Sequence, residues 1–100
     1  MQLLVEPMPR RCLSISFIAE GAEDFQDGFT VEEWDVCMDD GYPDPDLTIH
    51  ADNKGIIVPR GTFTIILGDE KLYFKWDGRK LTDVPTGHVY YEREFLINVN

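Results

Sequence analysis

The chain has 100 residues, of which 43% are hydrophobic and 28% are charged, and its formal net charge is −10. This length fits one domain, residues 1–100, and the apolar content excludes a wholly disordered chain. No apolar run approaches the roughly 20 residues of a membrane-spanning helix, and the first basic residues follow an apolar stretch, the reverse of a secretory signal. We therefore expect a cytoplasmic protein that does not bind membranes.

The first predicted strand covers residues 12–18, where apolar and polar residues alternate and one face carries Leu13, Ile15 and Phe17. The stretch 21–29 is acidic and contains two glycines, so we expect a loop there. The two cysteines, Cys12 and Cys37, lie in apolar segments and are expected to be small buried residues and not a disulfide framework.

One short helix is predicted after Thr30, ending near Asp39. Thr30 and Glu33 have the form of a capping box. The apolar positions that follow at helical spacing are Val31, Trp34, Cys37 and Met38. A strand over residues 30–38 is the competing interpretation, because FTVEEWDV is rich in strand-forming residues. Residues 39–46 contain two prolines and a glycine, which predicts a turn or loop.

From residue 47 onward the pattern is β throughout. Alternation predicts strands over residues 47–51, 62–67 and 71–76, a return strand over 79–84 and a long last strand over 89–99. Turns are predicted at 68–71, at Asp77-Gly78 and at 85–87. The predicted fold class is α+β, mainly β: a curved antiparallel sheet of about six or seven strands, either a meander or a partly closed barrel, with one short helix packed against it.

Residues that could support catalysis form no recognised motif. His50 and His88 lie outside any hydrolase pattern, and with Cys12 and Cys37 they lack the close spacing of a zinc site. The acidic loop 39–46 does not follow the EF-hand pattern, which leaves at most a weak ion site. We therefore expect that the protein is not an enzyme and that it binds no cofactor or metal.

Lys71, Tyr73 and Lys75 would share one face of a strand and suit single-stranded nucleic acid, but the net charge opposes such binding. The negative charge is concentrated, since residues 20–52 carry twelve Asp and Glu and no Lys or Arg. Carboxylates at this density resemble the charge repeat of a nucleic-acid backbone, and the aromatic residues among them can act as anchors. The predicted partner-binding residues are Glu23, Asp24, Phe25, Asp27, Glu32, Glu33, Asp35, Asp39, Asp40, Tyr42, Asp44 and Asp46.

These features predict a small acidic protein-binding inhibitor. By analogy with other small acidic inhibitors, and without a residue match, it would be a nucleic-acid mimic of viral or mobile-element origin. Its partner would be a basic, nucleic-acid-binding protein of a host complex, bound without direct contact to nucleic acid. The alternative is a structural or assembly module of a viral particle or secretion machine, in which the edge of strand 89–99 drives self-association. The acids can also be no more than a solvated surface. We expect a monomer or a weak homo-oligomer.

Overall fold

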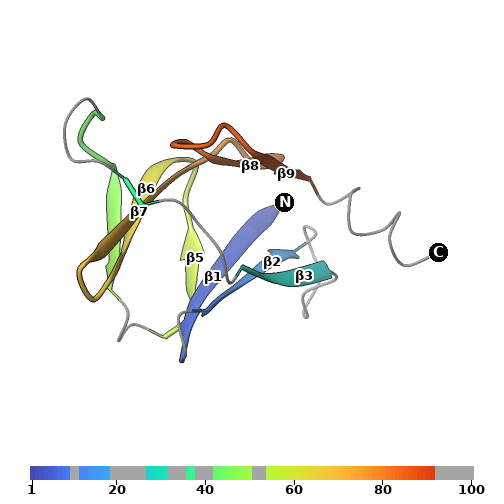
Figure 1. Cartoon of the computed structure of the whole chain (residues 1–100). Coiled ribbons are helices and arrows are strands. Elements are labelled where there is room, and N and C mark those ends of the chain that lie inside the picture. The colour runs from blue at the N-terminus through green and yellow to red at the C-terminus, as the bar shows by residue number, and fades with distance from the viewer. Residues whose placement is uncertain (10–11, 19–26, 32–35, 38–41, 51–53, 92–100) are drawn as a thin grey trace.

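The computed structural model describes residues 1–9, 12–18, 27–31, 36–37, 42–50 and 54–91. These residues form two β-sheets (Figure 1). The strands are β1 (Gln2–Met8), β2 (Cys12–Ile18), β3 (Asp27–Val31), β4 (Leu47–His50), β5 (Ile56–Val58), β6 (Gly61–Leu67), β7 (Glu70–Trp76), β8 (Lys80–Asp83) and β9 (Val89–Tyr91). None of the described segments is a helix with the length and apolarity needed to cross a membrane.

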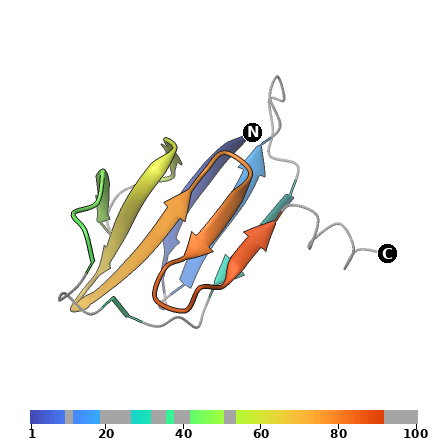
Figure 2. The same cartoon turned by 90° about the horizontal axis from the view of Figure 1, so that it is seen from above.

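The first sheet has four antiparallel strands in the order β3-β2-β1-β5, and the second has five in the order β4-β6-β7-β8-β9. In the second sheet β6 to β9 form the predicted antiparallel meander, whereas β4 pairs with β6 in parallel. The second sheet curves over the first in Figure 1, and from above the strands of both layers run in nearly the same direction (Figure 2). The described strands therefore form an aligned two-layer sandwich and not a closed barrel.

The core lies between the inner faces of the two sheets. On β2 the predicted inner residues Leu13, Ile15 and Phe17 are fully buried. The rings of Phe17 and Trp76 lie 5.9 Å apart between centroids and connect the two layers. The other buried members of this core are Leu3, Val5, Val31, Ile49, Val58, Phe63, Ile65, Leu72, Phe74 and Leu81. Each large apolar side chain buried here contributes about 1.5–3 kcal/mol.

The chain passes from the first sheet to the second between β3 and β4 and again, at a corner, between β5 and β6. Pro59 and Arg60 occupy this corner, and Gly61 opens β6 with a φ of 134°, which favours glycine. Pro59 has no amide hydrogen, so the strand ladder ends at this point. The corner places the exposed side chain of Arg60 beside the second sheet.

The prediction of a helix after Thr30 is wrong where the structure describes these residues. Thr30 and Val31 belong to β3 and pair with Ser14 and Leu13 of β2. The Cys37 amide donates to the carbonyl of Lys71 at 2.6 Å and not to a carbonyl of a preceding helical turn. Pairing with β2 and burial of Val31 outweigh the local capping signal. Residues 32–35 and 38 lie outside the described residues.

Three further strands differ from the prediction. The sequence pattern gave no strand at β1 or β5, which pair with each other in the first sheet. The loop predicted over residues 21–29 gives way to β3 at Asp27. The predicted strands at β2, β4, β6, β7 and β8 are confirmed, as are the turns between β6, β7, β8 and β9. The last strand is described only over Val89–Tyr91, and the rest of its predicted length lies outside the described residues.

Candidate functional site

The predicted partner-binding residues fall into two groups. Asp27 begins β3 opposite Phe17, and Tyr42, Asp44 and Asp46 lie in the segment before β4. The remaining predicted residues lie outside the described part of the chain: Glu23, Asp24, Phe25, Glu32, Glu33, Asp35, Asp39 and Asp40. Residues 36–46 lead from the first sheet to the second, and we call them the acidic crossover. The structure describes residues 36–37 and 42–46 of this stretch.

The acidic crossover is attached to the second sheet at three described points. The Cys37 amide donates to the Lys71 carbonyl at 2.6 Å, at one end of the crossover. The hydroxyl of Tyr73 donates to the carbonyl of Pro43 at 2.9 Å. At the other end, Asp46 bonds to Thr62, as described below. These bonds hold the described parts of the crossover against β6 and β7.

Tyr73 lies beneath the crossover on the outer face of the second sheet. Its ring centroid is 5.4 Å from that of Tyr42, and it is only 2% exposed. Its neighbour across the ladder, Thr64, is fully buried on the same face. Tyr73 shares this face with Lys71 and Lys75, as the sequence predicts, but its covered ring is not available for stacking with a nucleic-acid base.

Asp46 has a structural role that the sequence does not reveal. Its carboxylate accepts the backbone amide of Thr62 at 2.9 Å and the hydroxyl of the same residue at 3.2 Å. In return the Asp46 amide donates to the Thr62 carbonyl at 2.9 Å. These bonds fix the start of the parallel β4–β6 pair. Asp44 is exposed, as Asp46 is, but its carboxylate forms no hydrogen bond with a described residue.

Neither histidine nor cysteine residues assemble a metal centre in the described part of the chain. No group of three or more His, Cys, Asp or Glu is placed there to hold a metal ion. Cys37 is buried and Cys12 is half-buried, and neither forms a disulfide. His88 packs edge-on against Tyr90, with ring centroids 4.4 Å apart, and so has a packing role.

The turn between β7 and β8 gathers positive charge from neighbouring residues of the chain and from Arg60, which is distant in sequence. A Cβ added to Gly78, which has a φ of 96°, would lie 2.6 Å from Nε of Arg60, so the guanidinium of Arg60 lies directly against this turn. Arg79 and Lys80 follow in the turn, and Lys75 precedes it on β7. Arg60 was not foreseen here, because only the corner between the two sheets brings it to the turn.

One carboxylate, Asp77, lies in this turn and is already bonded to the backbone. It accepts the amides of Arg79 and Lys80, both at 2.8 Å. The bond from the Lys80 amide is the main cause that holds the pKa of Asp77 below its ordinary value, helped by the Arg79 amide and by the charges of Lys80 and Lys75. Asp77 therefore stabilises the turn as an anion.

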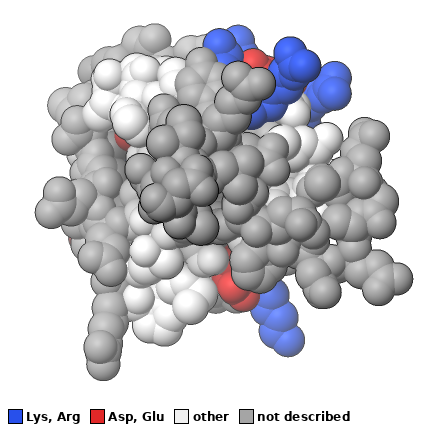
Figure 3. Space-filling view, turned by 90° about the vertical axis from the view of Figure 1, so that its right-hand side faces the viewer, with Lys and Arg blue, Asp and Glu red and all other residues white. Residues whose placement is uncertain are grey.

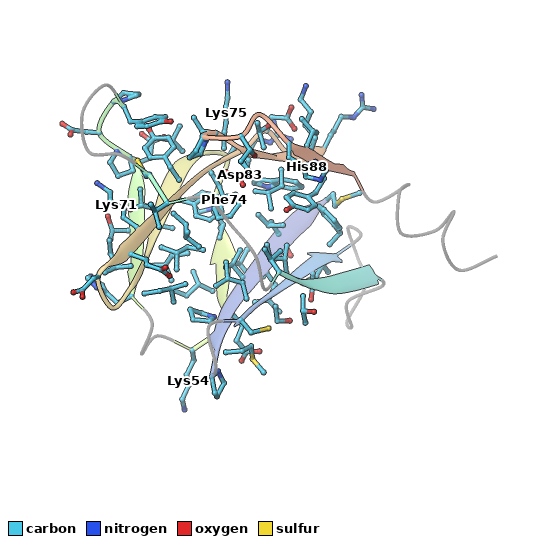
Figure 4. All side chains as sticks on the ribbon, in the orientation of Figure 1. Lys54, Lys71, Phe74, Lys75, Asp83 and His88 are labelled. Atoms are coloured by element: carbon cyan, nitrogen blue, oxygen red, sulfur yellow. The ribbon has the colours of Figure 1, made fainter. Side chains whose placement is uncertain are left out.

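We refer to Arg60, Lys75, Arg79 and Lys80 as the basic cluster. Figure 3 shows Lys and Arg side chains gathered at the upper end of the molecule, where β8 and β9 lie in Figure 1. In Figure 4 Lys75 points outward at this end, whereas Lys54 projects from the opposite end. Among the described residues, no carboxylate forms an ion pair with these four cations.

The acidic crossover and the basic cluster adjoin on the outer face of the second sheet. Thr62, which bonds to Asp46, lies directly opposite Lys75 in the β6–β7 ladder. The inner positions beside this pair are filled by Phe63 and Phe74, so Thr62 and Lys75 both point outward. One face thus carries negative and positive charge side by side. Comparisons with family models, with curated proteins and with solved structures gave no match.

Proposed function

We propose that the protein acts by binding a basic, nucleic-acid-binding protein through the acidic crossover and so blocks the surface that would bind nucleic acid. The attachment of the crossover to β6 and β7 at three points carries this proposal. Because Asp44 lies between the attachment points at Pro43 and Asp46, its carboxylate loses less conformational freedom on binding than one in a free tail would. Asp44 is exposed within this fixed segment.

The charge of the chain supports the same proposal. Twelve acids and no Lys or Arg in 20–52 attract a positively charged surface and increase the rate of encounter. Tyr42, half-buried against Tyr73, offers an aromatic edge beside Asp44. Because neither Cys12 nor Cys37 forms a disulfide, a reducing, cytoplasmic setting is part of the proposal.

The experiment begins with the immobilised protein, which captures partners from a lysate of its own host at low salt. A captured nucleic-acid-binding protein that is released both by salt and by added DNA is the expected result. The purified partner is then titrated against Asp40→Asn/Asp44→Asn, which we expect to weaken binding about tenfold and to reduce its salt dependence. Asp46 is left unchanged, because its loss would disturb the β4–β6 pair.

A matched control removes the same charge elsewhere. Glu6 on β1 and Asp69 in the β6–β7 turn are both exposed and lie outside the crossover. Glu6→Gln/Asp69→Asn should bind the partner like the unchanged protein. Equal weakening by the two double variants would show that only net charge matters and would reject the crossover as the binding surface.

Self-association through a strand edge is the second candidate function. It is favoured by the position of β9 at the end of the second sheet, where β9 pairs with β8 and with no other described strand. Association through backbone hydrogen bonds of this edge would persist in high salt. A protein that stays monomeric in high salt across the micromolar range would reject this function.

A further inference from the structure

We infer that the outer face of the five-stranded sheet binds a second copy of this chain in a symmetric dimer, with the acidic crossover of each copy on the basic cluster of the other. The inference rests on the same crossover as the proposed function, but it concerns a different partner and is tested with the pure protein alone. Dimer formation would cover the crossover and compete with the proposed partner.

The first argument is the placement of the two charges. The bond between Asp46 and Thr62 fixes the end of the crossover next to Lys75, which lies opposite Thr62. A two-fold axis brings the same patch of both copies together, so such a patch must be complementary to itself. A face with adjoining acidic and basic halves meets this condition, because rotation places each half over the opposite charge.

The second argument is the lack of charge compensation at the basic cluster. The two described carboxylates beside it are already engaged: Asp77 accepts the amides of Arg79 and Lys80, and Asp46 accepts the amide and hydroxyl of Thr62. The side chains of the cluster therefore keep their capacity to bind an outside anion. Residues 20–52 supply twelve carboxylates and no Lys or Arg, so a second copy offers the complementary charge.

The surface between the two charged parts permits close approach. Thr48, Thr62 and Thr82 occupy outward positions on β4, β6 and β8, and their side chains are short. Lys75 is exposed and rises from the same face, as Figure 4 shows. The side chains that flank Lys75 in the ladder, Thr62 and Thr82, therefore leave room for a crossover from a second copy to reach this cation.

Nucleic acid fits this face less well than a second copy. Tyr73 is covered by the crossover and offers no ring for a base. The phosphate backbone would also have to approach the chain beside its own carboxylates, whereas a second copy places those carboxylates on the cations. At physiological salt, charges more than about 8 Å apart are largely screened, so the local match decides the contact.

The test uses sedimentation velocity on the full chain across the micromolar range, at low and at high salt. We expect a dimer at low salt that dissociates in high salt. Lys75→Glu/Lys80→Glu and Asp44→Lys should each be monomeric alone, with self-association at least about tenfold weaker. An equimolar mixture of the two variants should form a heterodimer, because both contacts then pair opposite charges again.

The controls carry charge reversals outside this face. Lys54→Glu and Asp69→Lys change exposed residues away from the cluster and the crossover and should dimerise normally. Thermal unfolding of each variant checks that the fold is kept.

A monomeric unchanged protein, a mixture that stays monomeric, or growth beyond a dimer would each overturn the inference. Binding of duplex DNA that is lost in Lys75→Glu/Lys80→Glu, without a protein dimer, would also overturn it. Failure here leaves the capture of a host partner, and thus the proposed function, to be judged separately.

Discussion

At the scale of single residues, Gly61 and Asp46 determine how the chain enters the second sheet. An added Cβ at Gly61 would lie 2.5 Å from Oδ2 of Asp46, and the φ of 134° is itself strained for any other residue. We expect Gly61→Ala to lower the free energy of unfolding by about 1–3 kcal/mol. In the Asp46→Ala background the clash is absent, so the same change should cost less. A double-mutant cycle from urea unfolding measures this coupling, and strict additivity would contradict it.

Asp77 gives the protein a residue-scale dependence on pH. The pKa of its carboxyl lies below its ordinary value of 3.8, first because of the Lys80 amide. A carboxyl whose pKa is lower in the folded than in the unfolded chain stabilises the fold at pH values above the unfolded pKa. This stabilisation is lost as the pH falls through the pKa of the folded state. The melting temperature of Asp77→Asn should therefore lie below that of the unchanged protein at pH 7, and the difference should shrink below pH 3.8. A difference that is constant with pH would reject this role.

At the scale of elements, the hydroxyl of Tyr73 ties the acidic crossover to β7. Tyr73→Phe removes its bond to the Pro43 carbonyl but keeps the ring contact with Tyr42. We expect a loss of about 0.5–1.5 kcal/mol in stability and faster amide exchange at Cys37. The control is Tyr42→Phe, since that hydroxyl forms no hydrogen bond with a described residue. Equal effects of the two changes would show that the bond to Pro43 does not hold the crossover.

The strands that could be predicted from the sequence are those in which apolar and polar residues alternate within the strand itself. Strands such as β2 and β7 alternate clearly, and the turns between β6 and β9 carry glycine where a positive φ is needed. β1 was missed because its apolar run does not alternate with polar residues at the start and is interrupted by Glu6 and Pro7. The helix after Thr30 was predicted from a capping box, but pairing of β3 with β2 is a long-range contact that this local signal does not include.

The candidate site was predictable only in part for the same reason. The acidic region is visible in composition, yet the structural use of Asp46 depends on Thr62, which meets it through the parallel β4–β6 pair. The basic cluster depends on Arg60, which the corner after β5 brings against Gly78. Neither contact can be predicted from local spacing in the sequence, because each joins residues that are at least 16 positions apart.

At the scale of the whole molecule, the two sheets are held together by large side chains between them, and Trp76 is the largest of those that are fully buried. It meets Phe17 across the layers at 5.9 Å. Trp76→Ala should cost about 3–5 kcal/mol, a large share of the ~5–15 kcal/mol that stabilises a typical domain. Ile57→Ala is the control, because Ile57 is 45% exposed and should change stability by less than about 1 kcal/mol. Urea unfolding followed by far-ultraviolet circular dichroism compares the two. If Trp76→Ala unfolds at the same urea concentration as Ile57→Ala, the sheets do not depend on this contact, and the sandwich must be stabilised elsewhere in its core.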